Sequence, residues 1–160
     1  MDPSFPLLDL HRHLDGSIRL ETILDLGRQH NLPLPAWSAE ELRPYVQVSE
    51  PQPGLMAFLD KFEWYTGVLV DYDACRRIAY ENIEDALNEG IDYIELRFSP
   101  WFMAEANGLD PAGVVEAVAD GGVDAGEGID LGLLQGGEEP SQTVGGFGPG
   151  DVETHWDLPV

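Results

Sequence analysis

The chain has 160 residues, a length typical of one domain, and carries 30 Asp and Glu against 8 Lys and Arg, a formal net charge of −22. This charge argues against binding to nucleic acid polymers, because Lys and Arg are needed to neutralise phosphates. Apolar residues make up 43% of the chain, enough for a core, yet no stretch approaches the ~18 uninterrupted apolar residues that would predict a membrane-spanning helix.

The cysteine content and the amino terminus predict a cytoplasmic protein. Cys75 is the single cysteine, so the chain has no internal disulfide. The first residues, MDPSFPLLDLHRH, lack the basic region and long apolar run of a secretory signal peptide. Both features fit a reducing compartment.

The stretch LLDLHRHLDGS, residues 7–17, predicts a short strand that ends in a turn. Side chains alternate along a strand, so His11 and His13 are expected on one face together with Asp9. Two imidazoles on one face can share a metal ion, and a catalytic zinc typically takes three protein ligands. The spacing alone also fits an exposed histidine pair without metal, or a site for iron, nickel or cobalt.

Helical segments are predicted between the turn and residue 70. Ser17 is a candidate cap for the first, which the prolines after Asn31 end. His30, at the end of this helix, is expected to face solvent. Ser38 and Glu41 have capping-box spacing, which predicts a second helix start. Residues 54–70 place apolar side chains three and four apart, as in an amphipathic helix that faces the core.

A helix, a strand and a further helix follow. Asp73 is the expected cap of the helix, and Gly90 its end. Alternation in residues 93–98 predicts a strand with one apolar face (Ile94, Leu96, Phe98) and one polar face (Tyr93, Glu95, Arg97), where the two charges pair with each other or with neighbours. Asp110 and Pro111 are typical of the start of the next helix.

Three segments, in the same order, resemble the adenosine deaminase family of the metal-dependent amidohydrolase superfamily: HRHLDG, ACRRIAYENIEDA and YIELRFSP. The resemblance covers about residues 6–120 and implies a (β/α)8 barrel. Strands that alternate with helices independently favour βαβ units and a parallel sheet. We therefore expect an α/β fold, the amino-terminal portion of an incomplete (β/α)8 TIM barrel.

The resemblance implies zinc-dependent hydrolytic deamination of adenosine and deoxyadenosine to inosine and ammonia, in purine salvage. In the family, zinc is held by two histidines of the first strand, a third histidine and an aspartate. A hydroxide formed on the metal attacks C6 of the purine, and a glutamate moves the protons. His11 and His13 match the first two metal ligands. His13 and Asp15 match positions that contact the purine nucleoside substrate, and Phe58 and Phe62 lie in the region that closes the pocket.

No general acid or base is identified in the sequence. The third histidine, the aspartate ligand and the glutamate belong to later strands of the family. The remaining histidine, His155, lies in ETHWDLP, which does not resemble the family motif. The chain alone is therefore expected to be inactive. The alternatives are a non-catalytic fragment or a relative that deaminates adenine or another 6-aminopurine. A cytidine-type deaminase is excluded, since its P-C-x-x-C motif needs two cysteines. No protein partner is predicted.

The composition changes after residue 120. Eleven of the 18 glycines lie between Gly121 and Gly150, and no Lys or Arg follows Arg97. Such a sequence predicts loop or disorder. We therefore divide the chain into a barrel portion, 1–120, and a Gly-rich acidic tail, 121–160, in which neither a helix nor a further strand is expected. A frameshift or a broken gene would produce non-native sequence of this kind, and a genuine acidic tail is the alternative. A complete barrel takes ~250 residues, so the chain has room for two or three units.

Overall fold

A computed structural model of the chain describes residues 5–48, 51, 54, 56, 61–125, 130–135 and 143–147. Among these residues, strand β1 and the short 3₁₀-helix η1 come first, further helices follow, and a long helix then leads to strand β2. The elements are β1 (Leu8–His13), η1 (Leu14–Gly16), α1 (Leu20–Gln29), α2 (Ala39–Val46), α4 (Phe62–Thr66), α5 (Tyr72–Asn88), β2 (Tyr93–Phe98), α6 (Pro100–Glu105), α7 (Pro111–Ala125), β3 (Asp130–Gln135) and β4 (Thr143–Phe147).

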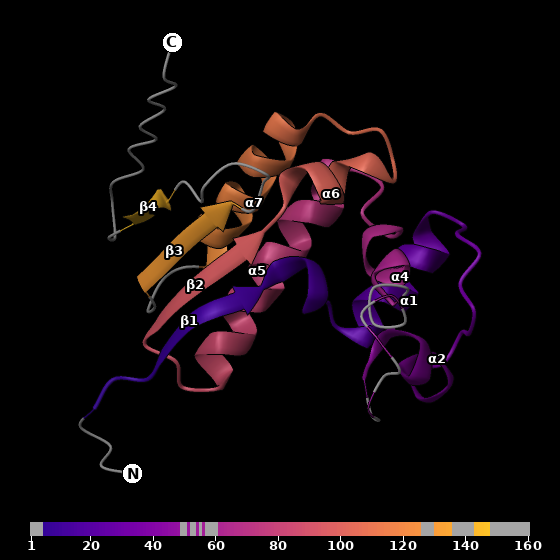
Figure 1. Ribbon diagram of the computed structural model, residues 1–160, viewed down its shortest axis with the longest axis horizontal. Coiled ribbons are helices and arrows are strands. Elements are labelled where there is room, and N and C mark those ends of the chain that lie inside the picture. The colour runs from indigo at the N-terminus through magenta and orange to yellow at the C-terminus, as the bar shows by residue number, and fades with distance from the viewer. Residues whose placement is uncertain are drawn as a thin grey trace.

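The four strands form one sheet in the order β1-β2-β3-β4. Strands β1, β2 and β3 are parallel, and β4 runs antiparallel to β3. Helices α5 and α7 lie behind the sheet, on the same side (Figure 1). Each parallel strand is thus joined to the next through helices, as in the first units of a (β/α)8 barrel. The predicted α/β class is confirmed.

The apolar face predicted for β2 packs beneath these helices. Ile94, Leu96 and Phe98 are at most 1% exposed. On the opposite face, Glu95 accepts a hydrogen bond of 2.8 Å from the hydroxyl of Tyr93. Glu95 therefore pairs with a neighbouring residue, Tyr93. The sequence predicted that the charges of this strand pair either with each other or with neighbours.

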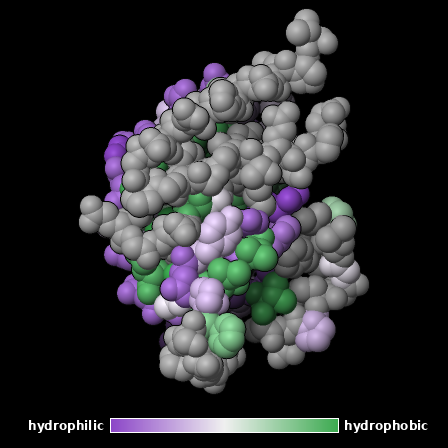
Figure 2. All heavy atoms as spheres, turned by 90° about the vertical axis from the view of Figure 1, so that its left-hand side faces the viewer, coloured by the Kyte–Doolittle hydropathy of each residue, from purple (hydrophilic) through white to green (hydrophobic). Residues whose placement is uncertain are grey.

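The other face of the sheet has no covering helix among the described residues. Leu8 and Leu10 of β1 are 57% and 54% exposed. Figure 2, which views the molecule from the left-hand side of Figure 1, shows hydrophobic side chains in patches among hydrophilic ones. A (β/α)8 barrel fills the corresponding space with side chains from the facing strands, so this face is the one that would line a barrel interior.

Several predicted helix boundaries are confirmed. The Oγ of Ser38 accepts a hydrogen bond from the Glu41 N–H at 3.3 Å and donates one to the Glu41 carboxylate at 2.9 Å, so Ser38 caps α2 as its spacing from Glu41 predicts. A carboxylate oxygen of Asp110 accepts from the Ala112 N–H at 3.0 Å, ahead of α7. Gly90 follows α5 with φ of +73°, a conformation that favours glycine.

Two predicted caps are wrong. Asp71, not Asp73, caps α5: its backbone is extended, and its carboxylate accepts a hydrogen bond from the Ala74 N–H at 2.8 Å. Asp73 lies within the first helical turn, where it faces the positive end of the helix dipole. Helix α1 begins at Leu20 without a side-chain cap, so Ser17 does not start it.

His30 also differs from expectation. Its side chain is only 23% exposed, and its Nε2 lies 3.7 Å from a carboxylate oxygen of Asp71. The prediction that it faces solvent is therefore wrong. The expected helix over residues 54–70 is described only in part, as α4, and Phe58 lies outside the described residues.

The expectation that residues after 120 form neither helix nor strand is wrong for residues 121–125, 130–135 and 143–147. Helix α7 continues through Gly121 to Ala125, and all six residues of β3 pair in parallel with β2. The glycines allow close helix packing: a Cβ on Gly121 would lie 2.2 Å from the carbonyl oxygen of Arg76 in α5. The non-native origin of the tail stays a prediction, and residues 126–129, 136–142 and 148–160 lie outside the described part.

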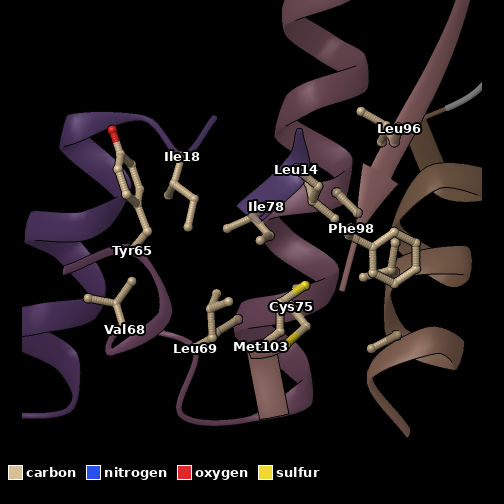
Figure 3. Packing of buried hydrophobic residues seen from close by; sticks show 14 of the residues in the cluster. Leu14, Ile18, Tyr65, Val68, Leu69, Cys75, Ile78, Leu96, Phe98 and Met103 are labelled. Carbon is tan, nitrogen blue, oxygen red and sulfur yellow. The ribbon is translucent and has the colours of Figure 1, made fainter. Parts of the chain in front are cut away.

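Cys75 of α5 is fully buried beside Leu69 and Met103 (Figure 3). Burial raises the pKa of its thiol to about 12. The thiol is therefore neutral near pH 7 and is not suited to act as a nucleophile or metal ligand. Within the described ranges, no helix combines the length and the apolar character needed to cross a bilayer.

Substituting Gly121 with Ala tests the contact between α5 and α7. We expect Gly121→Ala to lower the free energy of unfolding by about 2 kcal/mol, because the new methyl group meets rigid backbone. Gly122→Ala is the matched control, since its Cβ would meet only the flexible end of the Leu131 side chain, at 2.6 Å. Urea unfolding of both variants measures the difference. Equal stability of the two would contradict the packing described.

Candidate metal and nucleoside site

The two histidines of the H-x-H motif lie at the carboxyl end of β1. The ring centroids of His11 and His13 are 5.1 Å apart, with planes inclined by 57°. Both residues are exposed, and β1 runs parallel to β2, so the pair lies at the edge of the sheet where both strands end. The chain therefore presents two adjacent imidazoles on one side, as the strand alternation predicts.

Asp9 does not join the histidines, and that part of the prediction is wrong. Asp9 and Arg12 pair with Ile94 and Leu96, so two residues of β1 lie opposite one residue of β2 between these pairs. Such a bulge interrupts the alternation of side chains. A carboxylate oxygen of Asp9 accepts from Arg12 Nε at 2.8 Å, and Arg12 also contacts Glu89. The Asp9 carboxylate is therefore committed to an ion pair.

The turn after β1 is anchored in the core. Leu14 is fully buried and points toward Ile78 and Phe98 (Figure 3). Gly16 lies against α4, since a Cβ at this position would be 3.4 Å from Cε1 of Phe62. Leu14 and Gly16 thus fix the two ends of η1, which carries Asp15 between them.

Asp15 is a buried carboxylate with spare hydrogen-bonding capacity. It is 5% exposed, and among the described residues its Oδ1 has no hydrogen-bond partner. The Nδ1 of His13 lies 3.5 Å from Oδ1, without hydrogen-bond geometry. Burial raises the pKa of Asp15, and the nearby His13 and the backbone N–H of Ser99 oppose that shift. Burying a hydrogen-bond acceptor without a partner costs free energy. The Oδ1 of Asp15 is therefore available to accept a hydrogen bond from a ligand hydroxyl.

Aromatic rings lie beside this turn. The ring of Phe62 is 5.9 Å from that of Tyr65 and 6.3 Å from that of Phe102. Phe102 belongs to α6, directly after the exit of β2, and is 40% exposed. Phe102 is not among the residues predicted for the site from the sequence, although its place two residues after Ser99-Pro100 was a usable signal. Flat apolar ligands are typically bound between such rings.

The histidine pair fits zinc by the chemistry of its donors, because imidazole nitrogens are common zinc ligands. Within the described residues, however, no group of three or more His, Cys, Asp or Glu side chains could hold a metal ion. The pair His11 and His13 thus offers two imidazole donors, one fewer than the three protein ligands that a catalytic zinc site typically uses.

Residues 6–133 match the adenosine deaminase family. The chain is 65% identical over 116 residues to the adenosine deaminase of Pseudoalteromonas translucida, which covers 72% of the chain and 35% of that relative. A zinc-bound amidohydrolase from Burkholderia ambifaria superposes with a TM-score of 0.69 at 27% identity, over 82% of the chain and 35% of that structure. The adenine deaminase of Arthrobacter aurescens gives 0.65 at 25% identity, over 81% and 39%. The chain thus spans about a third of the length of its curated relatives.

Replacing Asp15 with Asn tests whether its burial is costly. A carboxyl whose pKa is raised by the fold destabilises that fold at any pH above the pKa of the same carboxyl in the unfolded chain, which includes pH 7. We expect Asp15→Asn to increase the free energy of unfolding by about 1 kcal/mol. Asp120→Asn, at an exposed position of α7, controls for the general loss of one negative charge. A loss of stability in Asp15→Asn would show that Asp15 makes a net stabilising contact.

Proposed function

Because the chain belongs to the adenosine deaminase family, we propose that it carries the first part of a zinc-dependent site that hydrolyses adenosine and deoxyadenosine to inosine and ammonia, in purine salvage. The observation that carries this proposal is the pair of imidazoles, 5.1 Å apart, beside a buried carboxylate whose Oδ1 has no hydrogen-bond partner among the described residues. All of these groups lie at the carboxyl end of a parallel strand, where (β/α)8 barrels place their chemistry.

His11 and His13 are the proposed zinc ligands. When bound, zinc supplies a Lewis acid that activates water near neutral pH. The imidazoles must be neutral to bind metal, and their exposure leaves them accessible. The two remaining family ligands, a histidine and an aspartate, are not assigned to residues of this chain.

His13 and Asp15 are the proposed contacts to the nucleoside. The Oδ1 of Asp15 can accept a hydrogen bond from a sugar hydroxyl, which would satisfy its buried lone pairs. Phe62, together with Phe58, is proposed to line the purine pocket. A nucleoside carries no phosphate, so the net charge of −22 does not repel it.

No residue of the chain is assigned as general acid or base. With two ligands and no proton-transfer group, the 160-residue chain alone is expected to turn over adenosine at a negligible rate. The alternative to an enzyme is that the chain is a fragment without catalytic activity. We place the protein in the reducing cytoplasm, in keeping with its single buried thiol.

Deamination of adenine is the second candidate reaction, favoured by the superposition on the adenine deaminase of Arthrobacter aurescens. Two observations favour adenosine. The sequence identity to an adenosine deaminase is 65%, against 25% to the adenine deaminase. Asp15 also offers an acceptor that a sugar hydroxyl can use.

A chimera tests the proposed function. Residues 6–120 of this chain replace the aligned segment of the Pseudoalteromonas translucida adenosine deaminase. We expect the chimera to convert adenosine to inosine in preference to adenine and to contain zinc. His11→Ala in the chimera is expected to lower kcat/KM by at least about 100-fold, more than the loss of an outer-shell partner, and to release zinc. Ultraviolet absorbance follows the reaction, and metal analysis follows the zinc.

His30→Ala is the control, since His30 lies at the end of α1, beside Asp71. It should leave both activity and zinc content near those of the parent chimera. Retention of zinc and activity in His11→Ala would refute the assignment of the ligand pair. Faster conversion of adenine than of adenosine would favour the second candidate.

A further inference from the structure

The turn that carries His13 and Asp15 is tied to α5 by a buried asparagine. We propose that Asn82 is a positioning residue, which holds residues 14–19 so that the metal ligand and the buried carboxylate keep their places. This inference rests on the proposed function of His13 and Asp15, and it adds a residue from a different part of the chain.

Asn82 is 2% exposed, and its amide group is fully used as a donor. Nδ2 donates to the carbonyl oxygen of Ser17 at 3.1 Å and to that of Ile78 at 3.0 Å. The bond to Ile78 stays within α5, whereas the bond to Ser17 joins segments 65 residues apart. Ser17 in turn donates its N–H to the Leu14 carbonyl at 3.3 Å, so the asparagine holds the end of η1.

Arg19 gives the same segment a second attachment to α5. Its guanidinium donates to Asp85, with the shortest contact at 2.5 Å, and to Glu84 at 2.7 Å. It also donates to the backbone carbonyl of Glu81 at 3.2 Å. Asn82 and Asp85 are three residues apart on α5 and therefore lie on one face of the helix. Between the two attachments, Ile18 is 6% exposed in the core.

The turn needs such support because Asp15 is costly to bury. A buried carboxylate oxygen without a hydrogen-bond partner, such as Oδ1 of Asp15, gains free energy by moving into water, so an untethered turn would carry Asp15 outward. The 3₁₀-helix has no side-chain cap of its own. Asn82 suits the task because it is neutral at every pH and its donors meet carbonyl oxygens only. The preorganisation of the site therefore depends on a residue that does not touch the metal or the substrate.

Asn82→Leu removes both donors at similar side-chain volume, and Asn88→Leu, at the exposed end of α5, is the matched control. Measurements use the 160-residue chain well below its unfolding temperature. We expect hydrogen exchange of the backbone amides of residues 14–19 to accelerate about tenfold in Asn82→Leu, while amides of α7 are unaffected. Zinc affinity, measured by competition with a chromophoric chelator, should fall about 3- to 10-fold.

A residue that only stabilises the fold would lower the unfolding temperature without changing either readout in the folded protein. That result would overturn the proposal, as would equal effects in Asn88→Leu. Asn82→Ser provides the same readouts if the leucine variant does not fold. If the parent chain binds no zinc, the proposed metal site fails, while exchange at residues 14–19 still decides the role of Asn82.

Discussion

The parallel pairing of β1 with β2 is the constraint on which the candidate site depends. Pairing from Leu8↔Tyr93 to His13↔Arg97 ends both strands at one edge of the sheet. Two segments that lie far apart in the sequence meet there: the HRHLDG turn and the SPWF start of α6. The buried face of β2 makes this pairing obligatory, because a shift of one residue would expose Ile94, Leu96 and Phe98 to water. The stability of the sheet and the geometry of the site thus have one cause.

The site itself works against stability. Asp15 is buried with an unused acceptor, whereas Leu14, its neighbour in the same short helix, is anchored in the core. The burial of Leu14 in the core and the hydrogen bonds between residues 14–19 and α5 hold the Asp15 carboxylate in a buried position. Without them it would move into water. Strained or unsatisfied groups of this kind are common at functional sites, since a ligand can supply the missing partner. Helix α5, on the outer side of the sheet, therefore affects the geometry of the candidate site at the edge where β1 and β2 end.

Local patterns predicted much of this architecture, and their failures have identifiable physical causes. The alternation in β2 and the helix cap at Ser38 were readable because each depends only on neighbouring residues. The bulge in β1 was not readable, since it arises from pairing with β2 and moves Asp9 away from the histidines. Glycine composition argued against structure after residue 120, yet Gly121 is where α7 packs against α5. The unsatisfied carboxylate of Asp15 and the place of Phe102 beside Phe62 also needed the tertiary fold.

The most direct test of the central claim, that the carboxyl end of β1 forms a metal-binding pair, is a zinc titration of the chain followed by NMR of the histidine ring nitrogens. We expect the ring signals of His11 and His13 to change together, at the same zinc concentration, while the signals of His30 stay in place. Zinc binding that leaves both His11 and His13 unchanged, or that perturbs His30 first, would contradict it.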